Sequence, residues 1–278
     1  MSTAIDVTGR LRKMPVTASD PVEYVLRVGD ESLALNALIG HPISLEFTGT
    51  IRCIHCDRST RKSFGQGHCY PCFKRLAACD SCIVSPEKCH YHEGTCREPE
   101  WGETHCMTEH VVYLANSSGV KVGITRASQV PTRWVDQGAI TAVPMLRVAT
   151  RQLAGLVEVA CKQHVADRTN WRTMLKGEAP PIDLEAEKRH LLGLIQEELA
   201  ALRQQHGDDA IREVTEECVS FSYPVQVWPD KVKSHNLDKT PLVTGRLEGI
   251  KGQYLMLDTG VINIRKYTAY EVRVRVQD

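Results

Sequence analysis

Nine of the eleven cysteines in this protein lie between Cys53 and Cys106, and their spacing is typical of metal-binding thiolates. The first four follow the pattern Cys53-x2-Cys56-x12-Cys69-x2-Cys72. Each Cys-x-x-Cys pair places two thiolates on one side of a tight turn, and two such pairs complete the tetrahedral four-sulfur site that structural zinc requires. The sequence therefore predicts one zinc ion held by these four residues.

A second group of candidate ligands follows the first. Cys79 and Cys82 form a third Cys-x-x-Cys pair, and we expect them to bind an ion together with two other residues, which brings the total to about two zinc ions. An interleaved arrangement, in which the first and third pairs share one ion, is the alternative. Sequential sites are favoured because the first four cysteines already satisfy one ion. The candidates for the other two ligands are Cys89, His92, Cys96 and Cys106.

Disulfides are the competing interpretation of so many cysteines. The first residues of the chain lack the basic and apolar regions of a signal peptide, so we expect a cytoplasmic protein whose thiols stay reduced. No run approaches the roughly 18 apolar residues that span a bilayer, so we expect no membrane association. Basic and acidic residues are equal in number, 34 each. Any nucleic-acid-binding surface must therefore be local.

Such a local surface is expected around the first two cysteine pairs. Cationic residues outnumber acidic ones there, and Phe64, Tyr70 and Phe73 lie among them. Cations beside aromatic faces suit phosphate contact and base stacking. The solvated face of an ordinary structural zinc segment is the alternative. The candidate nucleic-acid-binding residues are Arg58, Arg61, Lys62, Lys74 and Arg75.

The segment after the cysteines predicts a small α/β unit. His110–Ala115 and Val120–Thr125 have the apolar, β-branched composition of two strands joined by a hairpin turn. A short helix is expected at 132–136 and a third strand at 143–148. From Arg151 to Ala166, apolar residues recur at helical spacing.

The order of motifs in this unit resembles the GIY-YIG nuclease superfamily. Tyr113 stands in the first motif, Lys121-Val-Gly-Ile-Thr125 forms the second, Arg133 follows, and Glu158 lies on the helix. The sequence is most similar to the branch found in phage-type proteins, in which the second motif begins with lysine. Lys121 stands where many active members have a second tyrosine.

The resemblance implies a phosphodiesterase centre. In the superfamily the tyrosine assists proton removal from water, the arginine holds the scissile phosphate and the helical glutamate binds a divalent metal. Tyr113, Arg133 and Glu158 would take those roles, with Arg126 as the alternative arginine and magnesium or manganese at Glu158. Such an ion and such a cation would neutralise the charge that develops on phosphate.

The remaining elements predict an α+β fold with a barrel-like β unit. Short strands in residues 1–50 are too few to form a core alone, and the strands after Cys218 are their best partners. Asp183–His206 predicts one long amphipathic helix. The expected divisions are an N-terminal β segment (1–50), a zinc-binding cysteine-rich segment (51–106), a GIY-YIG-like unit (107–177), an acidic amphipathic helix (178–217) and a β-rich C-terminal unit (218–278).

Three stretches together resemble one family of uncharacterised prokaryotic proteins, a resemblance that implies no activity. They are Ser63–Cys72, Gly94–Gly102 and Lys121–Arg126. The leading hypothesis is a zinc-containing nucleic-acid-binding protein that acts as a metal-dependent nuclease. The alternatives are a non-catalytic binding module for RNA or single-stranded DNA and a protein-interaction scaffold. DNA and RNA remain open alternatives, and the sequence predicts no oligomeric state.

Overall fold

The computed structural model describes residues 5–277 and divides the chain into two compact units. The first unit contains the chain up to Lys74, Leu175–Gly177 and the chain from Phe221 onward. The second contains Arg75–Met174 and Glu178–Ser220. Helices and strands occur in similar shares, which confirms the predicted α+β class. Within residues 5–277, every helix is too short or too polar to cross a bilayer.

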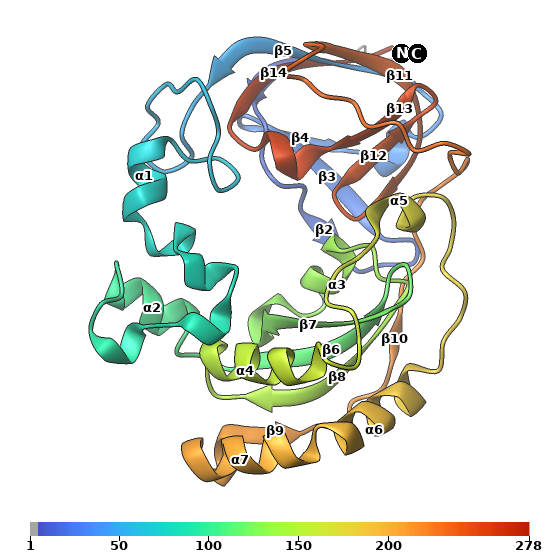
Figure 1. Cartoon of the computed structure of the whole chain (residues 1–278). Helices are drawn as coiled ribbons and strands as arrows, with labels where there is room; N and C mark the ends of the chain where they lie inside the picture. The colour runs from blue at the N-terminus through green and yellow to red at the C-terminus, as the bar shows by residue number, and fades with distance from the viewer. Residues whose placement is uncertain (1–4, 278) are drawn as a thin grey trace. The chain divides into compact units, whose positions relative to one another are not determined.

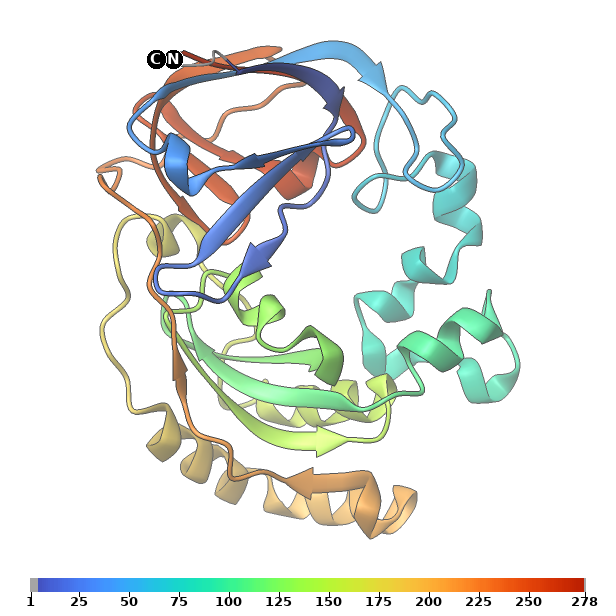
Figure 2. The ribbon, with the colours of Figure 1, turned by 180° about the vertical axis from the view of Figure 1, so that it is seen from behind.

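A six-stranded antiparallel sheet dominates the first unit, in the order β1-β14-β5-β11-β12-β13. β1 (Ile5–Arg10) and β5 (Pro42–Ile51) come from the start of the chain, and β5 lies between two strands from its end (Figure 1, Figure 2). Strands from the two ends of the chain therefore share one core. The C-terminal strands are β11 (Leu242–Lys251), β12 (Tyr254–Leu257), β13 (Gly260–Asn263) and β14 (Tyr270–Val276).

This sheet is open, so the predicted closure into a barrel is wrong. Alternating residues of β5 and β14, such as Leu45 and Val274, are buried on one face, as a half-buried sheet requires. At the far edge, Val261 of β13 forms an isolated parallel bridge with Ser234. The segment around Ser234 thus covers the edge that a barrel would have paired with β1.

A three-stranded sheet accompanies the large one, in the order β2-β3-β4. Its strands are β2 (Val16–Thr17), β3 (Glu23–Val28) and β4 (Glu31–Ala34). β4 ends at Ala34, and the single-turn helix η1 (Asn36–Leu38) follows it. The Asn36 side chain accepts from the Tyr24 amide and donates to the Val22 carbonyl, both at 2.9 Å. These bonds offer the backbone an alternative to the strand ladder.

The second unit is built on a five-stranded antiparallel sheet. β6 (His110–Asn116) lies between β7 (Val120–Arg126) and β8 (Thr141–Val148), so the predicted hairpin and third strand are present. β8 also pairs with β9 (Ile211–Glu213) and β10 (Val219–Ser220). In the hairpin, Tyr113 stands opposite Gly123.

Helices of the second unit pack on this sheet through an apolar core. α4 (Arg151–Cys161), α6 (Leu184–Leu194) and α7 (Gln196–His206) bury Val157, Leu191 and Leu199 against it (Figure 1). The single helix predicted from Asp183 to His206 is interrupted at Ile195, two residues after Gly193, the residue in this stretch that favours helix least. The shorter helices of the chain are α1 (Tyr70–Arg75), α2 (Pro99–His105), α3 (Thr132–Asp136) and α5 (Trp171–Met174).

His110, the first residue of β6, makes the stability of the fold depend on pH. Its ring is fully buried, and its Nδ1 lies 2.7 Å from the Thr108 carbonyl oxygen. Burial, aided by the charges of Arg151 and Arg126, lowers the pKa of His110 to about 4. Between that value and about 6.5 the unfolded chain binds the proton and the folded chain does not, so stability falls as pH falls through this window.

We expect this residue to lower the free energy of unfolding by about 3 kcal/mol as the pH falls from roughly 6.5 to 4. Urea unfolding of the wild type and of His110→Leu across this range measures the difference. The variant should lack that part of the pH dependence. Parallel pH curves for the two proteins would contradict the assignment.

Candidate functional site

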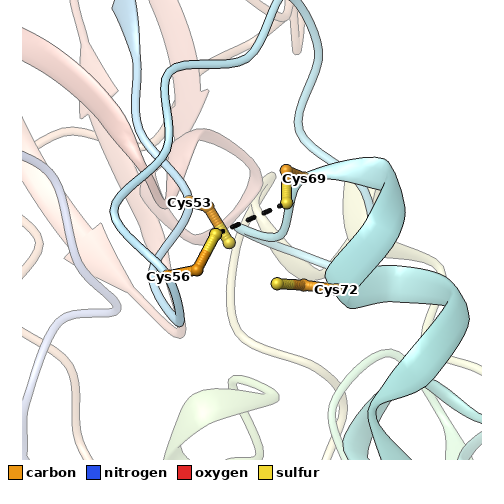
Figure 3. A group of neighbouring side chains, drawn as sticks. All are labelled: Cys53, Cys56, Cys69 and Cys72. Carbon is orange, nitrogen blue, oxygen red and sulfur yellow. Dashed lines mark hydrogen bonds between the residues drawn. The ribbon is translucent and has the colours of Figure 1, made fainter.

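The four cysteines of the first predicted metal site meet at one point of the first unit (Figure 3). The Sγ atoms of Cys53, Cys56, Cys69 and Cys72 all lie within 4.8 Å of one another. The Cys56 and Cys69 sulfurs are 3.7 Å apart. Zinc–sulfur bonds of about 2.3 Å in a tetrahedron place sulfurs about 3.8 Å apart. The donor set and its geometry therefore fit a zinc ion.

Local backbone structure positions the two cysteine pairs. Cys53 follows β5 and begins a turn in which its amide donates to the Arg58 carbonyl at 2.9 Å. Asp57 closes this turn with a φ of 57°. Cys69 accepts from the Phe73 amide at 2.9 Å as α1 begins, which brings Cys72 into the first helical turn. Each cysteine pair is thus positioned by its own turn. The spacing of the cysteines within each turn was therefore enough to predict both pairs.

The electrostatics of this centre favour a divalent cation. Burial raises the pKa of the Cys53 thiol, but backbone donors at Cys56, Cys69 and His55 outweigh that effect and lower the pKa to about 6. Burial and contacts with the other three thiols raise the pKa of Cys72 to about 12. One thiolate therefore keeps its neighbour protonated, and a bound cation would allow all four to ionise.

The five predicted nucleic-acid-binding residues are exposed, and four of them lie in the first unit with this centre, whereas Arg75 begins the second unit. The ammonium of Lys62 lies 5.6 Å from the centre of the Phe64 ring. That ring in turn packs on Tyr70 and Phe73, with centroids 5.4 and 5.7 Å away. Tyr70 is itself 55% exposed. Cationic and aromatic groups thus lie together on the surface, and their role remains a prediction.

In the second unit, Tyr113 and Lys121 share one hydrogen-bond acceptor. The Tyr113 hydroxyl donates to Gln137 Oε1 at 3.2 Å, and the Lys121 ammonium donates to the same oxygen. Both donors are buried. A Cβ on Gly123 would lie 2.7 Å from the Tyr113 hydroxyl oxygen, so the glycine allows the tyrosine to cross β7. Sequence reasoning missed Gln137, because a single glutamine after a short helix carries no motif.

Charged side chains border this buried pair. Arg133 of α3 and Glu158 of α4 are partly buried. Lys162 lies 3.2 Å from carboxylate oxygens of both Glu158 and Asp167. Sequence reasoning missed these two partners, although the spacing of Glu158 and Lys162 suits an ion pair within one helix. Together with Tyr113 and Lys121, these side chains place two carboxylates and three cations beside a phenol.

Burial shifts the pKa values of three groups in this cluster. Burial raises the pKa of Tyr113 to about 12, although the Arg133 charge opposes this. Burial, then the Arg133 charge, lowers the pKa of Lys121 to about 8. Burial also raises the pKa of Glu158, which the Lys162 charge opposes. At neutral pH Tyr113 is a hydrogen-bond donor, and the pKa of Lys121 lies closer to neutral than that of an ordinary lysine.

The structure brings four of the five predicted catalytic residues within electrostatic reach of one another. Tyr113 and Lys121 each respond to the charges of Arg133 and Glu158. Arg126 instead affects the pKa values of Cys106 and His110. Its placement favours Arg133 as the arginine that accompanies Tyr113.

The other predicted metal ligands lie in the segment from Leu76 to Cys106 of the second unit. Cys82, Cys89, Cys96 and Cys106 line one small cavity, together with Asp80, His90 and four further residues. Two other predicted ligands, Cys79 and His92, do not line this cavity. His92 is exposed.

The fold is α+β, and its first cysteine centre could hold a zinc ion. The chain belongs to the family described as "Protein of unknown function (DUF2797)", whose model matches residues 40–272. This range includes the cysteine cluster and the polar cluster around Tyr113. No curated protein and no solved structure matches the chain. The predicted membership of an uncharacterised family is confirmed, and the resemblance to GIY-YIG nucleases remains a prediction.

Proposed function

We propose that this protein binds nucleic acid and hydrolyses a phosphodiester bond at the cluster of Tyr113, Lys121, Arg133 and Glu158. The observation that carries the proposal is their convergence from four separate elements, β6, β7, α3 and α4. The sequence resemblance named these residues without knowledge of their spatial relation. A cation, a carboxylate and a neutral hydroxyl in one place suit the charge of a phosphodiester.

The order of elements supports the same proposal. β6 lies between β7 and β8, so the residue opposite Tyr113 is on β7 and its other neighbour is on β8. α3 connects β7 to β8 and carries Arg133, and α4 follows β8 and carries Glu158. Short connections of this kind bring side chains from successive elements together.

Arg133 and the carboxylates would act on the phosphate. The guanidinium of Arg133 is partly exposed and can donate to non-bridging phosphate oxygens. Glu158 and Asp167, which both pair with Lys162, are the groups that would hold magnesium or manganese. Such an ion, when bound, neutralises charge on the phosphate and on the leaving oxygen.

Lys121 would accept the proton of the attacking water. A general base is most effective when its pKa lies near the working pH, and that of Lys121 is lowered to about 8. Tyr113, with its raised pKa, would stay protonated and hold Gln137 in place. This assigns proton removal to the lysine rather than to the tyrosine that the resemblance suggested.

The first unit would supply the nucleic-acid-binding surface. Beside the zinc segment, a cavity of about 300 Å³ is lined by Ser63 and Gln66 together with Asn263, Arg265 and Lys266. Arg265 donates to Gln66 at 2.7 Å. Arg265 and Lys266, which lie in the single-turn helix η8 (Ile264–Tyr267), would thus add two cations beside the zinc segment, which suits a phosphate backbone.

The cofactors in this proposal are about two structural zinc ions and a divalent ion at Glu158. One zinc would occupy the four-cysteine centre of the first unit. The second would bind within the cysteine-rich segment of the second unit. Both would stabilise the fold rather than take part in hydrolysis, because four protein ligands leave no position for water.

Binding without cleavage is the second candidate, and the burial of the cluster favours it. Tyr113 has no exposed surface, and the Glu158 side chain is only 13% exposed and already paired with Lys162. A closed cluster of this kind would stabilise the unit while the basic surface of the first unit binds nucleic acid. In a cleavage assay, the proposed hydrolase would form product, and a protein that only binds nucleic acid would not.

Nucleic-acid binding is tested by reversing two charges on the zinc segment. Arg61→Glu with Lys62→Glu should weaken binding to labelled single-stranded DNA and RNA at least about tenfold and reduce the salt slope by about 2. Lys231→Glu with Lys233→Glu, a matched pair of exposed lysines in the same unit, is the control. Unchanged affinity in the first variant would contradict the proposed surface.

A further inference from the structure

The segment from Leu76 to Cys106 has almost no apolar core. It contains no strand, and α2 is its longest helix. Few of its residues are buried: Leu76, Ala77, Asp80, Pro86, Gly102 and Cys106. Its other elements are the single-turn helices η2 (Ala77–Cys79), η3 (Ser81–Ile83), η4 (Pro86–Lys88) and η5 (Tyr91–Glu93). A segment that buries so little apolar surface needs a cross-link to hold one structure.

Four cysteines surround the one small cavity of this segment described above. Cys82 lies in η3, Cys89 follows η4, Cys96 precedes α2 and Cys106 ends it. The cavity measures about 10 Å³. That is the space of a single water-sized sphere, which suits one ion and no larger ligand. A Cβ on Gly102 would lie 3.0 Å from the Tyr91 ring, so the glycine permits close packing of α2 on this ring beside Cys96.

We propose that Cys82, Cys89, Cys96 and Cys106 form a second four-thiolate zinc centre that fastens this segment to α4. The inference rests on the two-ion part of the proposed function and is independent of phosphodiester cleavage. It selects one ligand set from those that the spacing left open. Cys79, the first member of the third Cys-x-x-Cys pair, is not a ligand in this set.

Asp80 and His90 also face the cavity, and one ligand atom of each lies within 4.8 Å of the Cys82 sulfur. Their polar atoms already have protein partners. Asp80 Oδ1 accepts from the Ser81 amide at 2.6 Å, and its Oδ2 pairs with Arg97 at 2.8 Å. His90 Nδ1 lies 2.7 Å from the Thr95 hydroxyl, and its Nε2 lies 3.4 Å from Asp80 Oδ2. These contacts would hold the ligand-bearing turns in place, as groups outside the ligand set do in zinc sites.

The proposed centre is joined to α4 through the backbone of its own ligands. Gln152 donates to the Cys89 carbonyl at 2.8 Å, and the Arg151 amide donates to the Cys106 carbonyl at 2.8 Å. A Cβ on Gly155 would lie 2.6 Å from the Glu87 amide, so this glycine permits close contact with η4. An ion that orders these turns would also fix α4, the helix that carries Glu158.

Zinc content of purified, reduced protein tests the ligand set. The wild type should hold about two ions, whereas Cys96→Ser and Cys106→Ser should each hold about one. Cys79→Ser and His92→Asn, the matched controls, change residues that do not line the cavity and should retain about two. Loss of an ion from either control, or its retention in Cys96→Ser, would overturn the assignment. A wild type that holds about one ion would instead refute the proposal of two zinc ions. Failure of the ligand set and failure of the two-ion proposal therefore give different results.

A measurement on the wild type guards against variants that fail to fold. Zinc X-ray absorption should report only sulfur neighbours, at about 2.3 Å. A nitrogen or oxygen ligand would contradict two four-thiolate centres. In Cys96→Ser, hydrogen exchange of the α4 amides should be faster than in Cys79→Ser. Equal exchange in the two variants would contradict the role of the ion in fixing α4.

Discussion

Cys69→Ser is expected to release the zinc of the first centre and unfold the segment from Cys53 to Arg75. Apart from Gly67 and His68, the buried residues of this segment are the three proposed ligands Cys53, Cys69 and Cys72. Structural zinc contributes about 10–16 kcal/mol of apparent binding free energy in small zinc domains, so the loss of one thiolate removes most of what orders the segment. Zinc content and hydrogen exchange of residues 53–75 measure the effect.

The matched control is Cys218→Ser, which changes an exposed cysteine outside the cluster. It should keep its zinc and its exchange protection. The same zinc content and protection in Cys69→Ser as in the wild type would show that these thiols do not hold a structural ion.

The second large effect is expected from Glu158→Gln. The substitution keeps the size of the side chain and removes the charge that would hold a divalent ion at the phosphate. Loss of one charge-stabilising group from a hydrolytic centre costs about 100-fold to 1000-fold in rate, and loss of a metal ligand should cost at least that much. Binding should persist, because all residues of the proposed binding surface except Arg75 lie in the other unit.

Glu197→Gln is the control for this substitution. Glu197 is an exposed glutamate on α7, and removal of its charge should leave the rate of cleavage unchanged. A rate for Glu158→Gln equal to that of the control would exclude Glu158 from the reaction.

Local patterns in the sequence were sufficient to predict the first metal site and the β6–β7 hairpin. The ligands of the first site lie in two turns, each with its own Cys-x-x-Cys spacing, so no tertiary information was needed. The second cysteine group spreads over four short turns, and its proposed ligands lack the Cys-x-x-Cys spacing. Selection among Cys79, Cys89 and His92 therefore required the position of the cavity.

Features that depend on contacts between distant residues could not be predicted. The barrel was expected because turn-separated strands suggest closure, but the pairing of Ser234 with Val261 occupies the edge. Gln137 was not expected, since its role depends on Tyr113 and Lys121, which come from two strands. By contrast, the order of Tyr113, Arg133 and Glu158 along the chain was enough to nominate residues that the fold then brings together.

The most direct test of the proposed function is cleavage of labelled single-stranded DNA, duplex DNA and RNA by the wild type and by Glu158→Gln, with magnesium or manganese. Bound and cleaved species are resolved for each protein. We expect product from the wild type only with a divalent ion, and binding without product from the variant. Binding without product from the wild type would contradict hydrolysis and favour a binding module. Loss of both would contradict any role in nucleic-acid recognition.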